Sequence, residues 1–131
     1  MIDMKEPKQM PYTRLEGLSE KQLKEHHDVL YAGYVKKWNE IQQKLADADR
    51  VAANATYSEF GELKREETFA ANGIKLHEGY FDNMIAGGNL PSGIIKEWIE
   101  KDFGSYDQWQ TDFKALGLAA RGWVILAFDL D

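Results

Sequence analysis

The chain has 131 residues, which is enough to bury one hydrophobic core and too few for two independent ones. Its 22 acidic and 16 basic residues give a net charge of −6, which argues against a general nucleic-acid binder, since phosphate neutralisation needs clustered Lys and Arg. Cysteine is absent, so a tight transition-metal site would have to use His with Asp, Glu or water. No apolar run approaches the roughly 18 residues of a membrane span, and we expect a cytoplasmic protein with no membrane partner.

The N-terminal part of the sequence predicts an extended arm followed by a long amphipathic helix. Residues 1–17 are polar and include two prolines. Ser19 and Gln22 have the spacing of a capping box, and apolar positions then recur every three or four residues, which predicts a helix over 19–46. The residues on this stripe are Leu23, His26, Leu30, Tyr34, Trp38, Ile41 and Leu45.

The remaining pattern predicts a second long helix, two short helices and a terminal strand. The second helix is expected over 58–86, and Gly73 within it, which costs about 1 kcal/mol against Ala, predicts a close approach of the backbone to a neighbour. After the break "GGNLPSG" come "GIIKEWIEKDF" and, behind the capping-box pair Ser105 and Gln108, "WQTDFKALGLAA". The apolar run "GWVILAFDLD" predicts a buried strand.

That terminal strand has no candidate partner elsewhere in the sequence. An unpaired apolar strand exposes a row of backbone donors and acceptors, so something must pair with the residues from Trp123 to Phe128. We expect either that the natural polypeptide continues or that another chain supplies the missing strands.

The three histidines are the candidate metal ligands. His27 is interpreted as an ordinary surface or hydrogen-bonded residue, whereas His26 shares the apolar face of the first helix. His77 lies on the apolar face of the second helix. Two long helices joined by a short connection pack antiparallel, which would bring these two imidazoles together across the seam. A shared metal and a pair of hydrogen-bonded core histidines both remain open on the pattern alone.

Five motifs in order resemble the iron/manganese superoxide dismutases. The family's H-x-x-x-H-H-x-x-Y-V motif is matched by "HHDVLYAGYV", with the ligand at His26 and the tyrosine at Tyr34. "LHEGYF" matches N-H-x-x-[FY]-[WY], with the second ligand at His77. The "PY" near the amino end, "PSGIIKEWIEKDFGS" and "ARGWVILAF" match the family's "PY", "P-x-G…DFGS" and "GSGWxWL" segments, so the resemblance runs from about residue 11 to 128.

The sequence departs from the family at several functional positions. Leu30 and Tyr31 stand where the family has two further histidines, and Gly73 stands where some members have a glutamine. The other two protein ligands of the family lie in a D-x-W-E-H segment, which does not occur in these 131 residues, and Asp129 and Asp131 do not match it.

The resemblance implies a mainly α fold. A long antiparallel helical hairpin is followed by two short helices and the first strand of an incomplete α/β (α+β) C-terminal domain. It implies an N-terminal arm and hairpin domain over 1–90 and the truncated beginning of the C-terminal domain over 91–131.

The implied function is disproportionation of superoxide to dioxygen and hydrogen peroxide with an iron or manganese ion. The expected partners are superoxide and either a second copy of the chain or a complementary C-terminal segment. Alternatives are one half of a split enzyme, or a non-catalytic metal-binding or interaction protein of the same fold. The resemblance implies metal ligation by His26 and His77 and an outer-sphere catalytic hydroxyl on Tyr34. The residues implied around the pocket are Trp123, Phe81, Leu30 and Tyr80.

Overall fold

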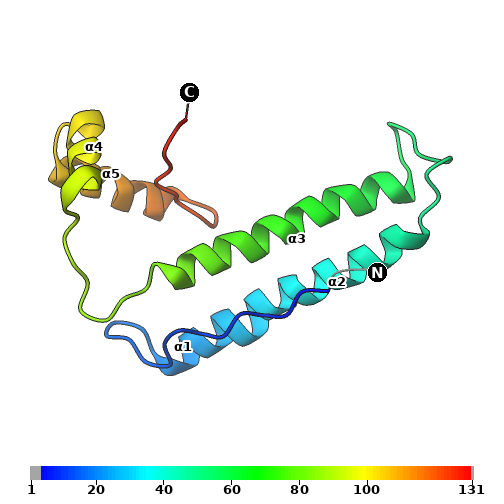
Figure 1. The fold of residues 1–131 in the computed structure, drawn as a ribbon, viewed down its shortest axis with the longest axis horizontal. Coiled ribbons are helices and arrows are strands. Elements are labelled where there is room, and N and C mark those ends of the chain that lie inside the picture. Colours follow the sequence, from blue (N-terminus) through cyan, green and yellow to red (C-terminus); the bar gives the residue numbers. More distant parts are fainter. Residues whose placement is uncertain (1–3, 131) are drawn as a thin grey trace. The chain divides into compact units, whose positions relative to one another are not determined.

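The computed structural model describes residues 4–130, which divide into two compact units, Met1–Gly87 and Gly88–Asp131 (Figure 1). The described residues are mainly helical, as the sequence predicts. None of their helices combines the length and the apolar character needed to cross a membrane.

The first unit is an extended arm followed by two long helical rods. The first rod contains α1 (Glu20–Lys24), the π-helical segment η1 (Glu25–Tyr31) and α2 (Ala32–Asp47) without a break. The second is α3 (Glu59–Asp82), which lies beside α2 and runs back along it (Figure 1). The predicted cap is present, since Ser19 Oγ accepts a hydrogen bond of 3.1 Å from the backbone N–H of Gln22.

The turn between the two rods satisfies the backbone groups that the helix ends leave open. The Arg50 guanidinium donates to the carbonyls of Leu45 and Ala48, at 2.8 and 2.9 Å, and so covers the C-terminus of α2. Ser58 caps α3 by accepting from the backbone N–H of Gly61 at 3.2 Å. The helix ends on both sides of the connection are therefore capped.

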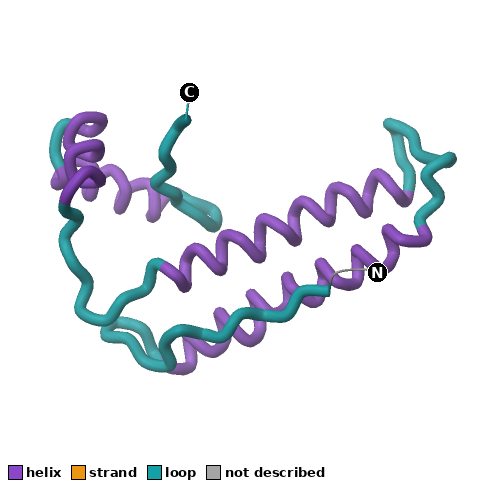
Figure 2. The backbone as a smooth tube through the Cα atoms, in the orientation of Figure 1, coloured by secondary structure: helices purple, strands orange, loops and turns teal. Residues whose placement is uncertain are grey.

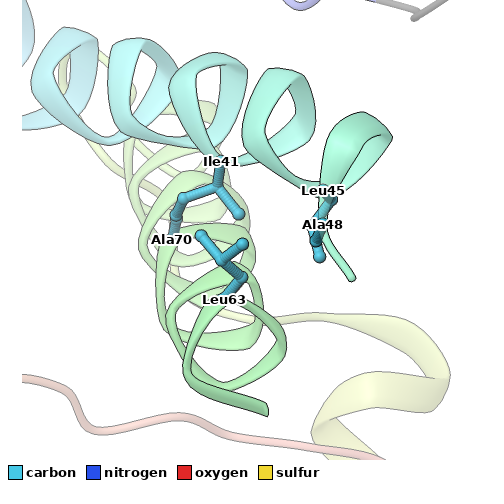
Figure 3. Close-up of a cluster of buried hydrophobic side chains, with 5 residues drawn as sticks. All are labelled: Ile41, Leu45, Ala48, Leu63 and Ala70. Atoms are coloured by element: carbon cyan, nitrogen blue, oxygen red, sulfur yellow. The ribbon is translucent and has the colours of Figure 1, made fainter. Parts of the chain in front are cut away.

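The two rods pack through two apolar clusters. Trp38 contacts both clusters and joins them into one seam. The cluster near the turn, shown in Figure 3, consists of Ile41, Leu45, Ala48, Leu63 and Ala70. The other, near the opposite end of the seam, consists of Tyr31, Val35, Ile74 and Phe81.

The π-helical segment corrects the predicted helix face. The backbone N–H of Ala32 donates to the carbonyl of His27, five residues back, so this turn holds one residue more than an α-turn. A strict α-helical period places Leu30 on the packed stripe, but Leu30 is 55% exposed and Tyr31 is 1% exposed. The wider turn therefore replaces Leu30 by Tyr31 in the core.

Gly73 marks the close approach that the sequence predicts. The ring of Tyr34 lies directly over its backbone, and a Cβ at this position would stand 2.6 Å from Cγ of Tyr34 and closer still to two other ring carbons. Only glycine leaves room for that ring at this point of α3.

α3 ends at Asp82, four residues before the predicted end at 86. The side-chain amide and the backbone N–H of Asn83 both donate to the carbonyl of Gly79, at 2.8 and 3.1 Å. Beyond them, Gly87 and Gly88 adopt positive φ angles that end any helical continuation.

The second unit contains the two short helices that the sequence predicts. α4 (Gly93–Phe103) ends at Gly104, whose φ of 85° turns the chain. α5 (Tyr106–Ala119) begins at Ser105, whose Oγ accepts from the backbone N–H of Gln108 at 3.1 Å. Ile99 is buried within this unit, and the Trp98 ring stacks on Phe128 with centroids 4.7 Å apart.

The predicted strand from Trp123 to Phe128 is not formed. Residues 120–130 are drawn as loop in Figure 2, and they have no ladder bonds to any other described segment. Ile125 and Phe128 are 61% and 64% exposed, so the segment is not buried either. A strand exists only when a neighbour pairs with its backbone, and the described part of the chain offers none.

Replacing Gly73 by Ala tests the close approach, with Gly79→Ala as the matched control in the same helix. A Cβ at 79 meets nothing within 4 Å, so Gly79→Ala should gain up to about 1 kcal/mol from helix propensity. Gly73→Ala should instead lose about 1–3 kcal/mol, because the Tyr34 ring has to move. Urea unfolding measures both, and equal stability of the two variants would contradict the packing described.

Candidate metal centre

His26 and His77 come from facing helices and meet at one end of the seam. His26 lies in η1, and His77 lies on the buried stripe of α3 together with Ile74 and Phe81. Their ring centroids are 4.9 Å apart with the planes at 80°. Two imidazoles that bind one ion, each with a metal–nitrogen distance of about 2.1 Å, have centroids roughly 5 Å apart. The spacing therefore fits a shared metal ion.

The hydrogen bond of His77 selects the tautomer that a metal ligand needs. Its side chain is buried, and Nδ1 donates to the backbone carbonyl of Gly73 at 2.7 Å. Because a carbonyl can only accept, the proton is on Nδ1, and in the neutral ring Nε2 carries the lone pair. The carbonyl also orients the ring and raises the basicity of Nε2, which is the usual outer support of a histidine ligand.

The surroundings of His26 favour its neutral, ligating form. Burial lowers the pKa of the His26 imidazole below its ordinary value, and the nearby His77 lowers it further. A neutral His26 imidazole is a nitrogen donor, a type of ligand that suits iron, manganese and other transition metals.

Aromatic side chains surround the two imidazoles. The rings of Tyr80 and Phe81 lie 5.0 and 5.3 Å from His26, and Phe81 is 3% exposed. The ring of Tyr34 lies 5.3 Å from His77, over Gly73. Tyr34, Tyr80 and Phe81 therefore lie beside the histidine pair.

Leu30, which is also expected at the pocket, is placed differently. Leu30 is more than half exposed because η1 turns it outwards. Trp123 belongs to the second unit, where it is partly buried, and its place at the pocket stays a prediction.

A polar layer behind the histidine pair is not apparent from the sequence. The Tyr31 hydroxyl donates to Glu78 Oε1 at 2.9 Å and accepts from the backbone N–H of Lys8 at 2.9 Å. Lys8 Nζ lies 2.9 Å from Glu78 Oε2. Burial raises the pKa of the Glu78 carboxyl, but the hydrogen bonds from Lys8 and Tyr31 outweigh it, and the pKa lies below its ordinary value.

His27 has the structural role that its interpretation as a hydrogen-bonded residue predicts. Nε2 donates to the carbonyl of Lys8 at 2.8 Å, and Nδ1 lies 2.7 Å from Asp28 Oδ1. It therefore holds the N-terminal arm against η1.

The described residues supply two candidate ligands and no complete set. No group of three or more His, Asp or Glu side chains among residues 4–130 is placed to hold one ion. The carboxylate of Glu78, which directly follows His77 in the sequence, is engaged by Lys8 and Tyr31. Asp131 lies outside the described residues.

Comparisons with known proteins identify the family of the chain. Residues 91–131 match the family model described as iron/manganese superoxide dismutases, C-terminal domain. Superoxide dismutase (Fe) of Aquifex aeolicus is 49% identical over 120 residues, which cover 88% of this chain and 56% of the relative. The chain belongs to the iron/manganese superoxide dismutase family.

Two further relatives of this superoxide dismutase-family chain are named for different metals. Superoxide dismutase (Fe) of Cupriavidus metallidurans is 44% identical over 118 residues, covering 88% of the chain and 58% of the relative. Superoxide dismutase (Mn) 2 of Haloferax volcanii is 37% identical over 129 residues, covering 95% of the chain and 62% of the relative. The chain thus spans little more than half the length of these relatives.

The lowered pKa of His26 predicts a specific pH dependence for this superoxide dismutase-family chain. The unfolded state binds a proton at the ordinary pKa of 6.5, and the folded state binds it only at lower pH. Above about pH 6.5 the lowered pKa of His26 therefore costs no stability. As the pH drops below that value, the unfolded state takes up the proton first and the free energy of unfolding decreases.

An NMR titration of His26 Hε1 in the metal-free chain should give a midpoint below 6.5. Urea unfolding should show a smaller stability loss between about pH 7.5 and 5.5 in His26→Gln than in the parent chain. A midpoint at or above the ordinary value would show that burial and His77 do not act on His26 as described.

Proposed function

We propose that this chain provides part of the active site of a superoxide dismutase that uses iron or manganese. The observation that carries the proposal is that the ring centroids of His26 and His77 lie 4.9 Å apart in a chain that belongs to this family. Both residues stand on the positions that match the family's ligands. The division of the chain into domains over 1–90 and 91–131 is part of the same proposal.

The bound metal would alternate between two oxidation states, so that one superoxide is oxidised to dioxygen and the next is reduced, with two protons, to hydrogen peroxide. His77 would bind the metal through Nε2 while Nδ1 donates to the Gly73 carbonyl. His26 would bind as a neutral imidazole, and Tyr80 and Phe81 would limit the access of water to the pair.

Tyr34 is proposed as the outer-sphere hydroxyl that links substrate, solvent and proton supply. Its ring is fixed by the contact with Gly73 and by the neighbouring Phe69, whose centroid is 5.7 Å away. A helical side chain leans towards the N-terminus of its helix, which turns Tyr34 towards His26. A hydroxyl held there can donate a proton to reduced dioxygen without serving as a ligand.

The remaining ligands are proposed to come from a D-x-W-E-H segment outside these 131 residues, on the same or on a separate polypeptide. Two neutral imidazoles add no charge to offset a trivalent ion, whereas that segment would add a carboxylate and a third imidazole. Completion by a second copy of the chain would require a carboxylate from Glu78, Asp82 or the tail to replace the missing ligand. Because Lys8 and Tyr31 already hold Glu78, the structure favours the complementary segment over the homodimer as the source.

A second candidate function is that of a non-catalytic metal-binding or interaction protein with this fold. It is favoured by the lack of a third ligand near the pair among the described residues. Within the main proposal the protein is a cytoplasmic antioxidant. Its net charge of −6 supports a small-molecule substrate rather than nucleic acid.

The proposal predicts that residues 1–131 alone retain metal weakly and remove superoxide poorly. A chimera in which the rest of the Aquifex aeolicus relative completes the chain should hold about one iron or manganese per chain and remove superoxide. His77→Gln in the chimera should lose the metal, because the amide cannot replace the imidazole.

Metal analysis and a superoxide-removal assay, run in parallel, decide between the functions. A chimera that holds its metal and leaves superoxide untouched would support the non-catalytic alternative. Robust activity of residues 1–131 alone, with stoichiometric metal, would overturn the proposal that a further segment is needed.

Tyr34→Phe in the same chimera should keep the metal and lower the turnover number by at least about tenfold, because a proton donor is lost while the ring remains over Gly73. Tyr57→Phe, at a tyrosine that is 69% exposed, is the matched control and should change neither quantity. Loss of metal in Tyr34→Phe would contradict an outer-sphere role.

A further inference from the structure

One residue of the N-terminal arm, Lys8, connects the two helices that carry the histidine pair. Its carbonyl accepts from His27 Nε2 at 2.8 Å, and its backbone N–H donates to the Tyr31 hydroxyl at 2.9 Å. Its ammonium group lies 2.9 Å from Glu78 Oε2. Lys8 thus uses three of its own groups to contact two residues of η1 and one of α3.

The three partners of Lys8 are direct neighbours of the candidate ligands. His27 directly follows His26 in η1, and Glu78 directly follows His77 in α3. Tyr31, the third partner, stacks on the ring of His77 with centroids 6.2 Å apart and planes at 28°. The contacts of Lys8 therefore lie at the level of the imidazole pair and not elsewhere along the seam.

Tyr31 is the central member of this network. It is the most deeply buried large side chain among the described residues, at 1% exposure. Its ring fills the core between His27, His77 and Phe81, while its hydroxyl joins the Lys8 backbone to the Glu78 carboxylate. A shift of the Tyr31 ring would therefore move the surface on which His77 rests.

The arm has a second attachment that fixes its path. Asn39 and Lys5 exchange two hydrogen bonds, each of 2.9 Å, and Lys5 Nζ lies 5.4 Å from the centroid of the Trp38 ring. In Figure 1 the arm runs along the first rod over this stretch. Residues 5 to 8 are thus held at both ends, and Lys8 is presented to η1 and α3 by a fixed backbone.

We propose that Lys8, Tyr31 and Glu78 form a strap that sets the spacing and orientation of the His26 and His77 rings. These are positioning residues, because they act on the metal only through the two imidazoles. The inference rests on the proposed function in taking those imidazoles as metal ligands. The strap supports the π-helical segment η1. In η1 the backbone hydrogen bonds reach one residue farther than in an α-helix, and we infer that this segment depends more on contacts from outside the helix.

The contacts of the strap differ in strength, so the variants that remove them should differ in how far they disturb the histidine pair. The Lys8 side chain is 61% exposed, so its ion pair with Glu78 is screened by water. The Tyr31 hydroxyl is buried, and its loss leaves the Lys8 N–H and the Glu78 carboxylate each without one partner. Tyr31→Phe should therefore disturb the histidine pair more than Lys8→Met.

The test uses the full chain without metal and then with Zn²⁺ as a diamagnetic probe. NMR of the metal-free chain measures nuclear Overhauser contacts between the ring protons of His26 and His77. A Zn²⁺ titration, followed at the same protons, measures the affinity of the pair. Lys37→Met, which removes an exposed ion pair with Glu40, is the matched control for Lys8→Met. Leu45→Ala, in the cluster near the turn, is the control for loss of stability.

We expect Tyr31→Phe to weaken the ring contacts and to lower the Zn²⁺ affinity by about ten- to a hundredfold, the usual effect of removing an outer support of a metal ligand. Lys8→Met should show the same change with a smaller amplitude. Lys37→Met and Leu45→Ala should leave both measurements as in the parent chain, although Leu45→Ala unfolds at lower urea concentration.

Unchanged ring contacts in Tyr31→Phe would overturn the strap, and so would an equal loss of affinity in Leu45→Ala. The metal content of the completed chimera decides whether the two histidines are metal ligands, as the proposed function requires, while the ring contacts in the metal-free variants decide whether the strap exists. The two failures are therefore distinguishable.

Discussion

The wide turn at η1 is the constraint on which the histidine site depends. The Ala32 N–H bonds to the carbonyl five residues back, and this extra residue changes which side chains face α3. It moves Tyr31 into the core beside His77 and turns Leu30 outwards. The π-helical segment includes His26, and π-helical turns of this kind occur often at functional sites because they present side chains that a regular helix would place elsewhere.

Close packing of the two rods explains why the site is formed at that end of the seam. Glycine at position 73 lets the Tyr34 ring lie on the backbone of α3, and the carbonyl of the same residue orients His77. One position thus serves both the helix contact and the ligand. A side chain there would displace Tyr34 and at the same time disturb the carbonyl that accepts the hydrogen bond from His77 Nδ1.

The charged groups near the site, Lys8 and Glu78, pair with each other and not with the candidate ligands His26 and His77. Burial and the nearby His77 lower the pKa of His26, which favours its neutral form, and the nearby carboxylate of Glu78 is held by Lys8 and Tyr31, with a pKa below its ordinary value. Burial also raises the pKa of Tyr31, so its hydroxyl stays protonated and keeps donating to Glu78. The negative charge of Glu78 is thereby paired with the Lys8 ammonium group. A metal bound to the two histidines would therefore need its balancing carboxylate from another residue.

The sequence by itself determined the helices, their caps and the family, because these depend on neighbours within a few residues or on motifs read in order. The caps at Ser19 and Ser105, the close approach at Gly73 and the facing positions of His26 and His77 were all predictable from spacing. The tertiary structure alone decided that Tyr31 rather than Leu30 enters the core. The spacing of apolar residues in the sequence does not reveal that one turn contains an additional residue. The tertiary structure alone showed the contacts of Lys8, which join residues 23 and 70 positions apart in the chain. It also showed that residues 123–128, although rich in strand-forming side chains, have no ladder in the described structure, because pairing requires a second strand and composition does not supply one.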